Sequence, residues 1–82
     1  MTLTNAIKKL EAKTQTEVIK LHNVYQVPFN DRVIEITQNG HDDEVATIRV
    51  RRPNDHDDSM SDYSAGAFFN NLSQAIRFCE GR

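Results

Sequence analysis

The chain has 82 residues, of which 38% are hydrophobic and 27% are charged, with three glycines and two prolines. This composition is typical of a globular domain and excludes a fibrous or low-complexity chain. The formal net charge is −2, and the basic residues do not form the cluster that marks a nucleic-acid-binding surface. We therefore expect one small domain over residues 1–82, with one hydrophobic core.

Three features bear on the cellular location. Cys79 is the only cysteine and has no partner for an internal disulfide, which favours a reducing compartment. The start MTLTNAIKKL lacks the apolar region of a secretory signal, and no apolar run approaches the roughly 20 residues of a membrane span. We expect a cytoplasmic protein without a membrane segment.

The first expected element is an amphipathic helix over residues 3–13. Its apolar side chains recur at helical spacing, and lysines occupy the other side. Thr2 or Thr4 can serve as the N-cap, since a threonine hydroxyl accepts from a free backbone N–H of the first turn. The predicted buried stripe is Leu3, Ala6, Ile7 and Leu10.

From residue 17 the pattern becomes rich in β-branched residues, in the runs EVIKL, VYQVPF, RVIEIT and VATIRVRR. Asn39-Gly40 lies between the last two runs and is a strong hairpin signal, because both residues tolerate positive φ. Pro28 has no amide donor, so residues 24–29 are predicted to be an edge strand or a strand that ends early. Three antiparallel strands are predicted, with a fourth from residues 17–21 left open.

Alternation within the predicted strands assigns side chains to two faces of the sheet. One set points toward the core: Ile34, Ile36, Ala46, Ile48 and Val50. A second set points to the opposite face: Glu35, Thr37, Arg49 and Arg51.

A second helix is predicted near residues 65–80. Its apolar stripe contains Phe68, Leu72, Ala75, Ile76 and Cys79, with Phe69 widening it. Cys79 is interpreted as a small buried hydrophobe. The expected fold class is α+β: a helix, a three- or four-stranded antiparallel sheet and a helix, with both helices on one sheet face.

The stretch VRRPNDHDDSMSDYSAG, residues 50–66, is the most unusual part of the chain. Asp55, Asp57 and Ser59 have the spacing with which a calcium loop begins, but Met60 and Gly66 stand where that loop needs Gly and Glu. The histidines and the cysteine show no paired zinc-ligand spacing. We therefore predict no metal site and no cofactor.

Capping is the main structural interpretation of the same stretch. Side-chain oxygens of Asp58, Ser61, Asp62 and Ser64 precede the second predicted helix, where they cap free amides and match the helix dipole. Capping needs fewer acidic groups than the four aspartates present, and the surplus favours a partner surface. The candidate contact residues are Asp55, His56, Asp57, Asp58, Met60, Asp62 and Tyr63, with Arg49 and Arg51 on the open sheet face.

Three functional hypotheses follow. The first is a non-enzymatic protein-binding module, such as an accessory or inhibitor protein of a phage or mobile element, that uses residues 54–63 and the open sheet face for a protein partner or self-association. No small-molecule substrate is identified. The second is nucleic-acid binding through Lys8, Lys9, Lys13, Lys20 and the strand arginines. The third is a small hydrolase or nuclease with His56 as general base, although the chain contains no recognised catalytic motif.

The second hypothesis has a topological basis. The expected order of helix, three strands and helix is similar to that of double-stranded RNA-binding domains, which place a lysine-rich motif at the start of the second helix. Residues 55–62, DHDDSMSD, stand at that place in this chain and would repel phosphates. The resemblance is therefore one of element order.

Overall fold

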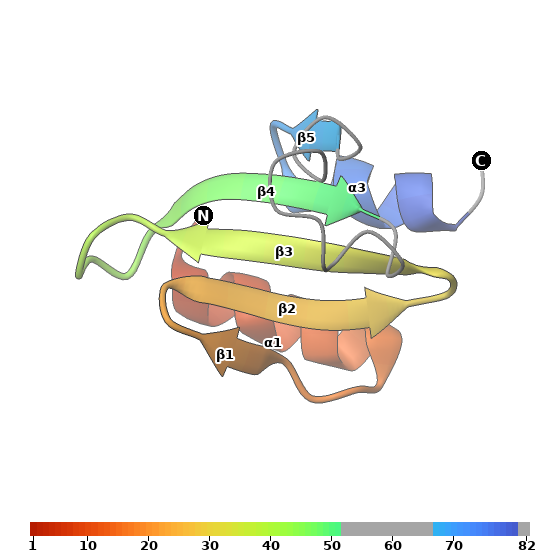
Figure 1. Cartoon of the computed structure of the whole chain (residues 1–82), viewed down its shortest axis with the longest axis horizontal. Coiled ribbons are helices and arrows are strands. Elements are labelled where there is room, and N and C mark those ends of the chain that lie inside the picture. The colour runs from red at the N-terminus through yellow and green to blue at the C-terminus, as the bar shows by residue number, and fades with distance from the viewer. Residues whose placement is uncertain (52–66, 81–82) are drawn as a thin grey trace.

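The structure is a computed structural model that describes residues 1–51 and 67–80. Within them the five strands form a single antiparallel sheet in the order in which they occur along the chain (Figure 1). The predicted α+β class is confirmed, but the sheet has five strands instead of three or four. The elements are α1 (Leu3–Thr14), β1 (Ile19–Leu21), β2 (Val24–Phe29), β3 (Arg32–Gln38), β4 (Val45–Arg51), β5 (Ala67–Phe69) and α3 (Leu72–Cys79).

Helix α1 begins and ends close to the predicted residues. Thr2 is its N-cap, and the Thr2 hydroxyl accepts a hydrogen bond of 3.2 Å from the backbone N–H of Asn5. Gln15 follows the helix at φ +56°, and its N–H donates to the carbonyl oxygen of Glu11. Leu3, Ala6 and Leu10 are buried, and Ile7 is partly buried. The amphipathic pattern therefore predicted both the helix and its buried side.

Short turns join the first three strands. The pairs Leu21–Val24 and Phe29–Arg32 close two-residue turns, in which His22 and Asn30 have φ +58°. The possible fourth strand from residues 17–21 is therefore confirmed as β1. Because β1 pairs only with residues 24–26, Pro28 lies where β2 is an edge, and a missing amide donor is tolerated there.

The core lies on one face of the sheet. Strand residues on that face form one hydrophobic cluster with buried residues of both helices. Asn30 also ties a hairpin turn to α3, since its side-chain amide donates to the Cys79 carbonyl oxygen at 2.8 Å. The buried residues of this hydrophobic core are Leu3, Ala6, Leu10, Val27, Ile34, Ile36, Ile48, Val50, Leu72, Ala75, Ile76 and Cys79.

Ala46 is one predicted core residue that the structure places elsewhere. The register shifts between Thr37 and Gln38, so that Thr37 pairs with Thr47 while Gln38 pairs with Val45. Ala46 is the extra residue of this bulge and is exposed, and Val45 packs against the core instead. Asn39-Gly40 does stand in the β3–β4 connection as predicted, with Gly40 at φ +62°.

The second helix starts later than predicted. Residues 67–69 form β5, in which Phe68 pairs with Arg49 and Phe69 with Ile48, and α3 begins only at Leu72. The prediction that Phe68 and Phe69 belong to the helix is wrong, because pairing with β4 satisfies their backbone before the helix starts. Asn71 caps α3 by accepting at 2.9 Å from the N–H of Gln74. None of the helices among the described residues is long and apolar enough to cross a membrane.

Candidate functional site

The face of the sheet opposite the core carries a row of aligned side chains, which we call the polar row. The strand registers place Ile19, Gln26, Glu35, Arg49 and Phe68 side by side, one from each strand. The two ends of the row are apolar and its three central members are polar. Arg51 lies two residues further along β4, opposite Val33.

Glu35 is the centre of a hydrogen-bonded cluster. One carboxylate oxygen, Oε1, accepts from Arg49 Nε at 3.0 Å and from Arg49 Nη2 at 2.7 Å. The other, Oε2, accepts from Arg51 Nε at 2.6 Å and from Gln26 Nε2 at 2.8 Å. Glu35 is 8% exposed and Arg51 is 9% exposed, so this charged cluster is largely removed from water.

These contacts set the pKa of Glu35. Burial is the largest single effect and raises the pKa, since it disfavours the charged carboxylate. The hydrogen bonds from Arg51 and Arg49, with the charges of both guanidinium groups, act in the opposite direction and together outweigh burial. The pKa of Glu35 therefore lies below its ordinary value, and the group is ionised at neutral pH.

Large exposed apolar side chains lie at the two edges of the sheet, one edge on each side of this cluster. Ile19 is 57% exposed and Leu21 is 52% exposed on β1, and Phe68 is 60% exposed on β5. Leu21 and Phe68 both line an open groove of about 500 Å³ across the sheet, whose other lining residues include Glu35 and Arg49. The groove thus joins a buried ion cluster to exposed apolar walls.

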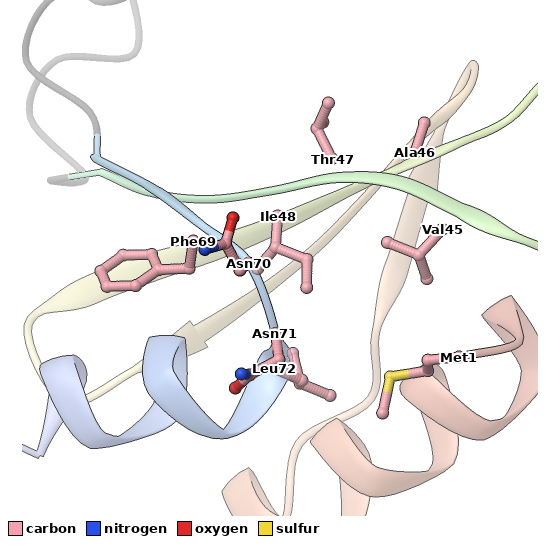
Figure 2. Close-up of a pocket in the computed structure, with 9 residues that line it drawn as sticks. All are labelled: Met1, Val45, Ala46, Thr47, Ile48, Phe69, Asn70, Asn71 and Leu72. Atoms are coloured by element: carbon pink, nitrogen blue, oxygen red, sulfur yellow. The ribbon is translucent and has the colours of Figure 1, made fainter.

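A smaller hollow of about 230 Å³ lies beside residues 45–48, at the start of β4. Figure 2 shows its lining side chains between β4 and the starts of α1 and α3. They are Met1, Val45, Ala46, Thr47, Ile48, Phe69, Asn70, Asn71 and Leu72. None of these side chains is charged, and the bulge at Ala46 interrupts the strand that forms the upper wall. The hollow therefore offers less specific chemistry than the polar row.

The predicted site residues divide into two groups. Arg49 and Arg51 lie on the sheet face opposite the core, as alternation predicted. The other candidates, Asp55, His56, Asp57, Asp58, Met60, Asp62 and Tyr63, lie outside the described residues. The capping role proposed for the aspartates is not needed at α3, because Asn71 fills it.

Sequence reasoning missed the burial of Glu35 and the place of Phe68 in a strand. Glu35 was placed on the correct face, but its burial depends on two arginines and a glutamine from neighbouring strands. The alignment of Glu35 with Arg49 was available as a signal once the hairpin register was assigned. Phe68 was missed because it was assigned to a helix.

Within residues 1–51 and 67–80, no three His, Cys, Asp or Glu side chains lie together in a way that could hold an ion. The calcium-like spacing that begins at Asp55 falls outside this range.

Comparisons of the chain with protein-family models, with curated proteins and with solved structures found no match. The polar row and its surroundings are therefore the basis on which a function can be assigned.

Proposed function

We propose that this chain is a non-enzymatic protein-binding module, in which both helices cover one sheet face and the opposite face contacts a protein partner or a second copy. The acidic segment 54–63 is the second part of the proposed contact surface, on sequence grounds alone. The observation that carries the proposal is the polar row, in which a buried ion cluster is flanked by exposed Ile19, Leu21 and Phe68.

The apolar ends of the row supply a driving force for association. Burial of apolar surface contributes roughly 25 cal/mol per Å², and aromatic residues are enriched among the residues that dominate binding energy. Phe68 presents an aromatic ring at one edge of the groove, and Leu21 presents an aliphatic side chain at the other. A partner that spans the groove would contact both.

The centre of the row suits an interface for a different reason. A charged group that loses water on binding costs free energy unless it is already paired. Glu35 already accepts four hydrogen bonds within the sheet and is nearly inaccessible to water. A partner could therefore cover this carboxylate with little additional desolvation.

Site-specific photo-crosslinking tests the proposal. A photoreactive amino acid is placed at Phe68 or Leu21, and the matched control is the exposed Ala12 of α1. In a lysate of the encoding organism we expect a discrete adduct from the two sheet positions and none from Ala12. An adduct of twice the chain mass identifies a second copy as the partner. Equal adduct patterns at all three positions, or none at any position, would refute the proposal.

The basic residues named in the nucleic-acid hypothesis lie in different parts of the fold. Arg49 belongs to the polar row, whereas Lys9 and Lys13 lie beside α3. Lys20 lies over the ring of Tyr25, with its Nζ 5.6 Å from the ring centre. The hydrolase hypothesis depends on His56, which lies outside the described residues. It stays a prediction, and its test is whether His56→Ala abolishes turnover of a substrate panel.

A further inference from the structure

A groove between the two helices combines several basic side chains with a hydroxyl. It has a volume of about 220 Å³ and lies between α1 and α3. Its lining residues are Lys9, Lys13, Ser73, Ile76, Arg77 and Glu80. None of them belongs to the polar row, so the groove is independent of the proposed protein-binding face.

The charges in this groove are not balanced. Lys13 pairs with Glu80, at 3.2 Å between Nζ and Oε2. Lys9 donates instead to a neutral group, the Ser73 hydroxyl, at 3.0 Å. Among the described residues no carboxylate lies within ion-pair distance of Lys9 or Arg77. The groove therefore contains three cationic side chains, Lys9, Lys13 and Arg77, but only one carboxylate, that of Glu80. This local excess of positive charge occurs in a chain whose formal net charge is −2.

The side chains of Lys9, Ser73 and Arg77 have the chemistry that recognises a phosphate. An ammonium group, a hydroxyl and a guanidinium group all donate hydrogen bonds to phosphate oxygens, and arginine can do so with two N–H groups at once. Lys9 and Ser73 already meet across the two helices, and Arg77 stands one helical turn after Ser73 on α3. We propose that this groove binds a phosphate group through Lys9, Ser73 and Arg77.

An NMR titration with inorganic phosphate tests the site directly. At constant ionic strength we expect phosphate to shift the backbone amide signals of α1 and α3 around the groove. Lys9→Gln and Arg77→Gln should each weaken phosphate binding at least threefold. Lys8→Gln is the matched control, because Lys8 is an exposed lysine of the same helix outside the groove, and it should leave binding unchanged.

Two outcomes of this phosphate titration would overturn the site. The first is that sodium chloride at the same ionic strength shifts the same signals to the same extent, which would indicate screening alone. The second is that Lys8→Gln weakens binding as much as Lys9→Gln. Thermal unfolding of each variant checks that the fold is retained, and these exposed substitutions should leave the midpoint nearly unchanged.

A second titration identifies the source of the phosphate. A single-stranded oligonucleotide that binds more tightly than inorganic phosphate, loses affinity in Lys9→Gln and Arg77→Gln, and weakens steeply with salt would point to a nucleic acid backbone. Binding of inorganic phosphate without a gain for the oligonucleotide would point to a small phosphorylated ligand. Oligonucleotide binding that is equal in wild type and in both groove variants would place nucleic acid elsewhere and contradict the proposed ligands.

Discussion

The replacement of Glu35 by glutamine should destabilise the fold much more than an ordinary surface substitution. Glutamine keeps the shape of the side chain but removes the charge and one acceptor oxygen. The Glu35 carboxylate accepts three hydrogen bonds from guanidinium groups, and the paired side chains are only 10–12% exposed. Removal of one partner from a buried ion pair costs about 3–5 kcal/mol. Because glutamine retains one acceptor, we expect a loss of about 2–4 kcal/mol in unfolding free energy.

The matched control is Glu80→Gln, which removes the charge from an exposed pair. The Lys13 and Glu80 side chains are 49% and 39% exposed, and pairs of this kind contribute at most about 1 kcal/mol. Urea unfolding at neutral pH, followed by circular dichroism, measures both variants against wild type. If Glu35→Gln lowers the unfolding free energy by no more than Glu80→Gln does, the ion cluster contributes no special stability.

The Glu35→Gln variant should also differ from wild type in how its unfolding free energy depends on pH. The folded-state pKa of Glu35 is lowered, so its contribution to stability is fully present above the ordinary carboxyl value of 4.5 and is lost as the pH falls toward the folded-state pKa. Wild type should therefore lose stability faster than Glu35→Gln as the pH falls below about 4.5. Parallel stability curves for the two proteins in that range would contradict the lowered pKa.

Three further predictions concern the second half of the described chain. Phe69→Ala should lower the unfolding free energy by about 2 kcal/mol, because the Phe69 ring packs against the Phe78 ring of α3 with the two ring centres 5.2 Å apart. Phe68 is exposed, so Phe68→Ala should lower it by less than about 0.5 kcal/mol. Equal losses in urea unfolding would contradict the assignment of these residues to β5. Asn71→Ala should cost about 1 kcal/mol through loss of the α3 cap, and Asn70→Ala much less; the reverse order would place the cap one residue earlier. Cys79 is 3% exposed and burial raises the pKa of its thiol, so an aromatic disulfide reagent should modify it at least tenfold more slowly in the native protein than in urea. Equal rates would show that the thiol is accessible in the folded state.

Local patterns were sufficient for the first helix and for the central strands. Alternation places one side chain on each face in turn, so the pairing of Ile34 with Val50 and of Glu35 with Arg49 follows once a hairpin joins the two strands. The exception is Ala46, where a bulge changes the alternation. A bulge leaves no clear sign in a short strand that contains both Ala and Thr, and the error there was unavoidable from sequence alone.

The start of the second helix shows the opposite limit. Helical spacing from Phe68 to Cys79 is a real property of the sequence, but a strand of three residues is too short for alternation to compete with it. Pairing with β4 decides the conformation of Phe68 and Phe69, and that contact links residues far apart in the chain. Asn71, an excellent N-cap residue directly before an apolar residue, was the local signal that marked the true start.

Burial of the candidate site depends on three strands at once. No local pattern shows that a glutamate in the middle of β3 will accept from β2 on one side and from β4 on the other. Its residue type alone suggests an exposed side chain. Its environment could therefore be recognised only from the complete sheet, whereas its face could be predicted from its neighbours Ile34 and Ile36.

The arrangement of the polar row separates two requirements of a binding surface. An antiparallel sheet face that meets only water usually alternates polar residues outward, with little apolar surface at its edges. Here the apolar residues stand at both edges, and the charged residues stand at the centre with their orientation fixed by hydrogen bonds. In the proposed interface the edges supply the hydrophobic contribution to affinity, and the fixed centre supplies specificity, because a partner must match a surface that cannot rearrange without breaking the ion cluster. Glu35→Gln weakens the centre and should therefore alter which proteins are crosslinked by a photoreactive residue at position 68. Removal of the Leu21 side chain should instead reduce the amount of every adduct.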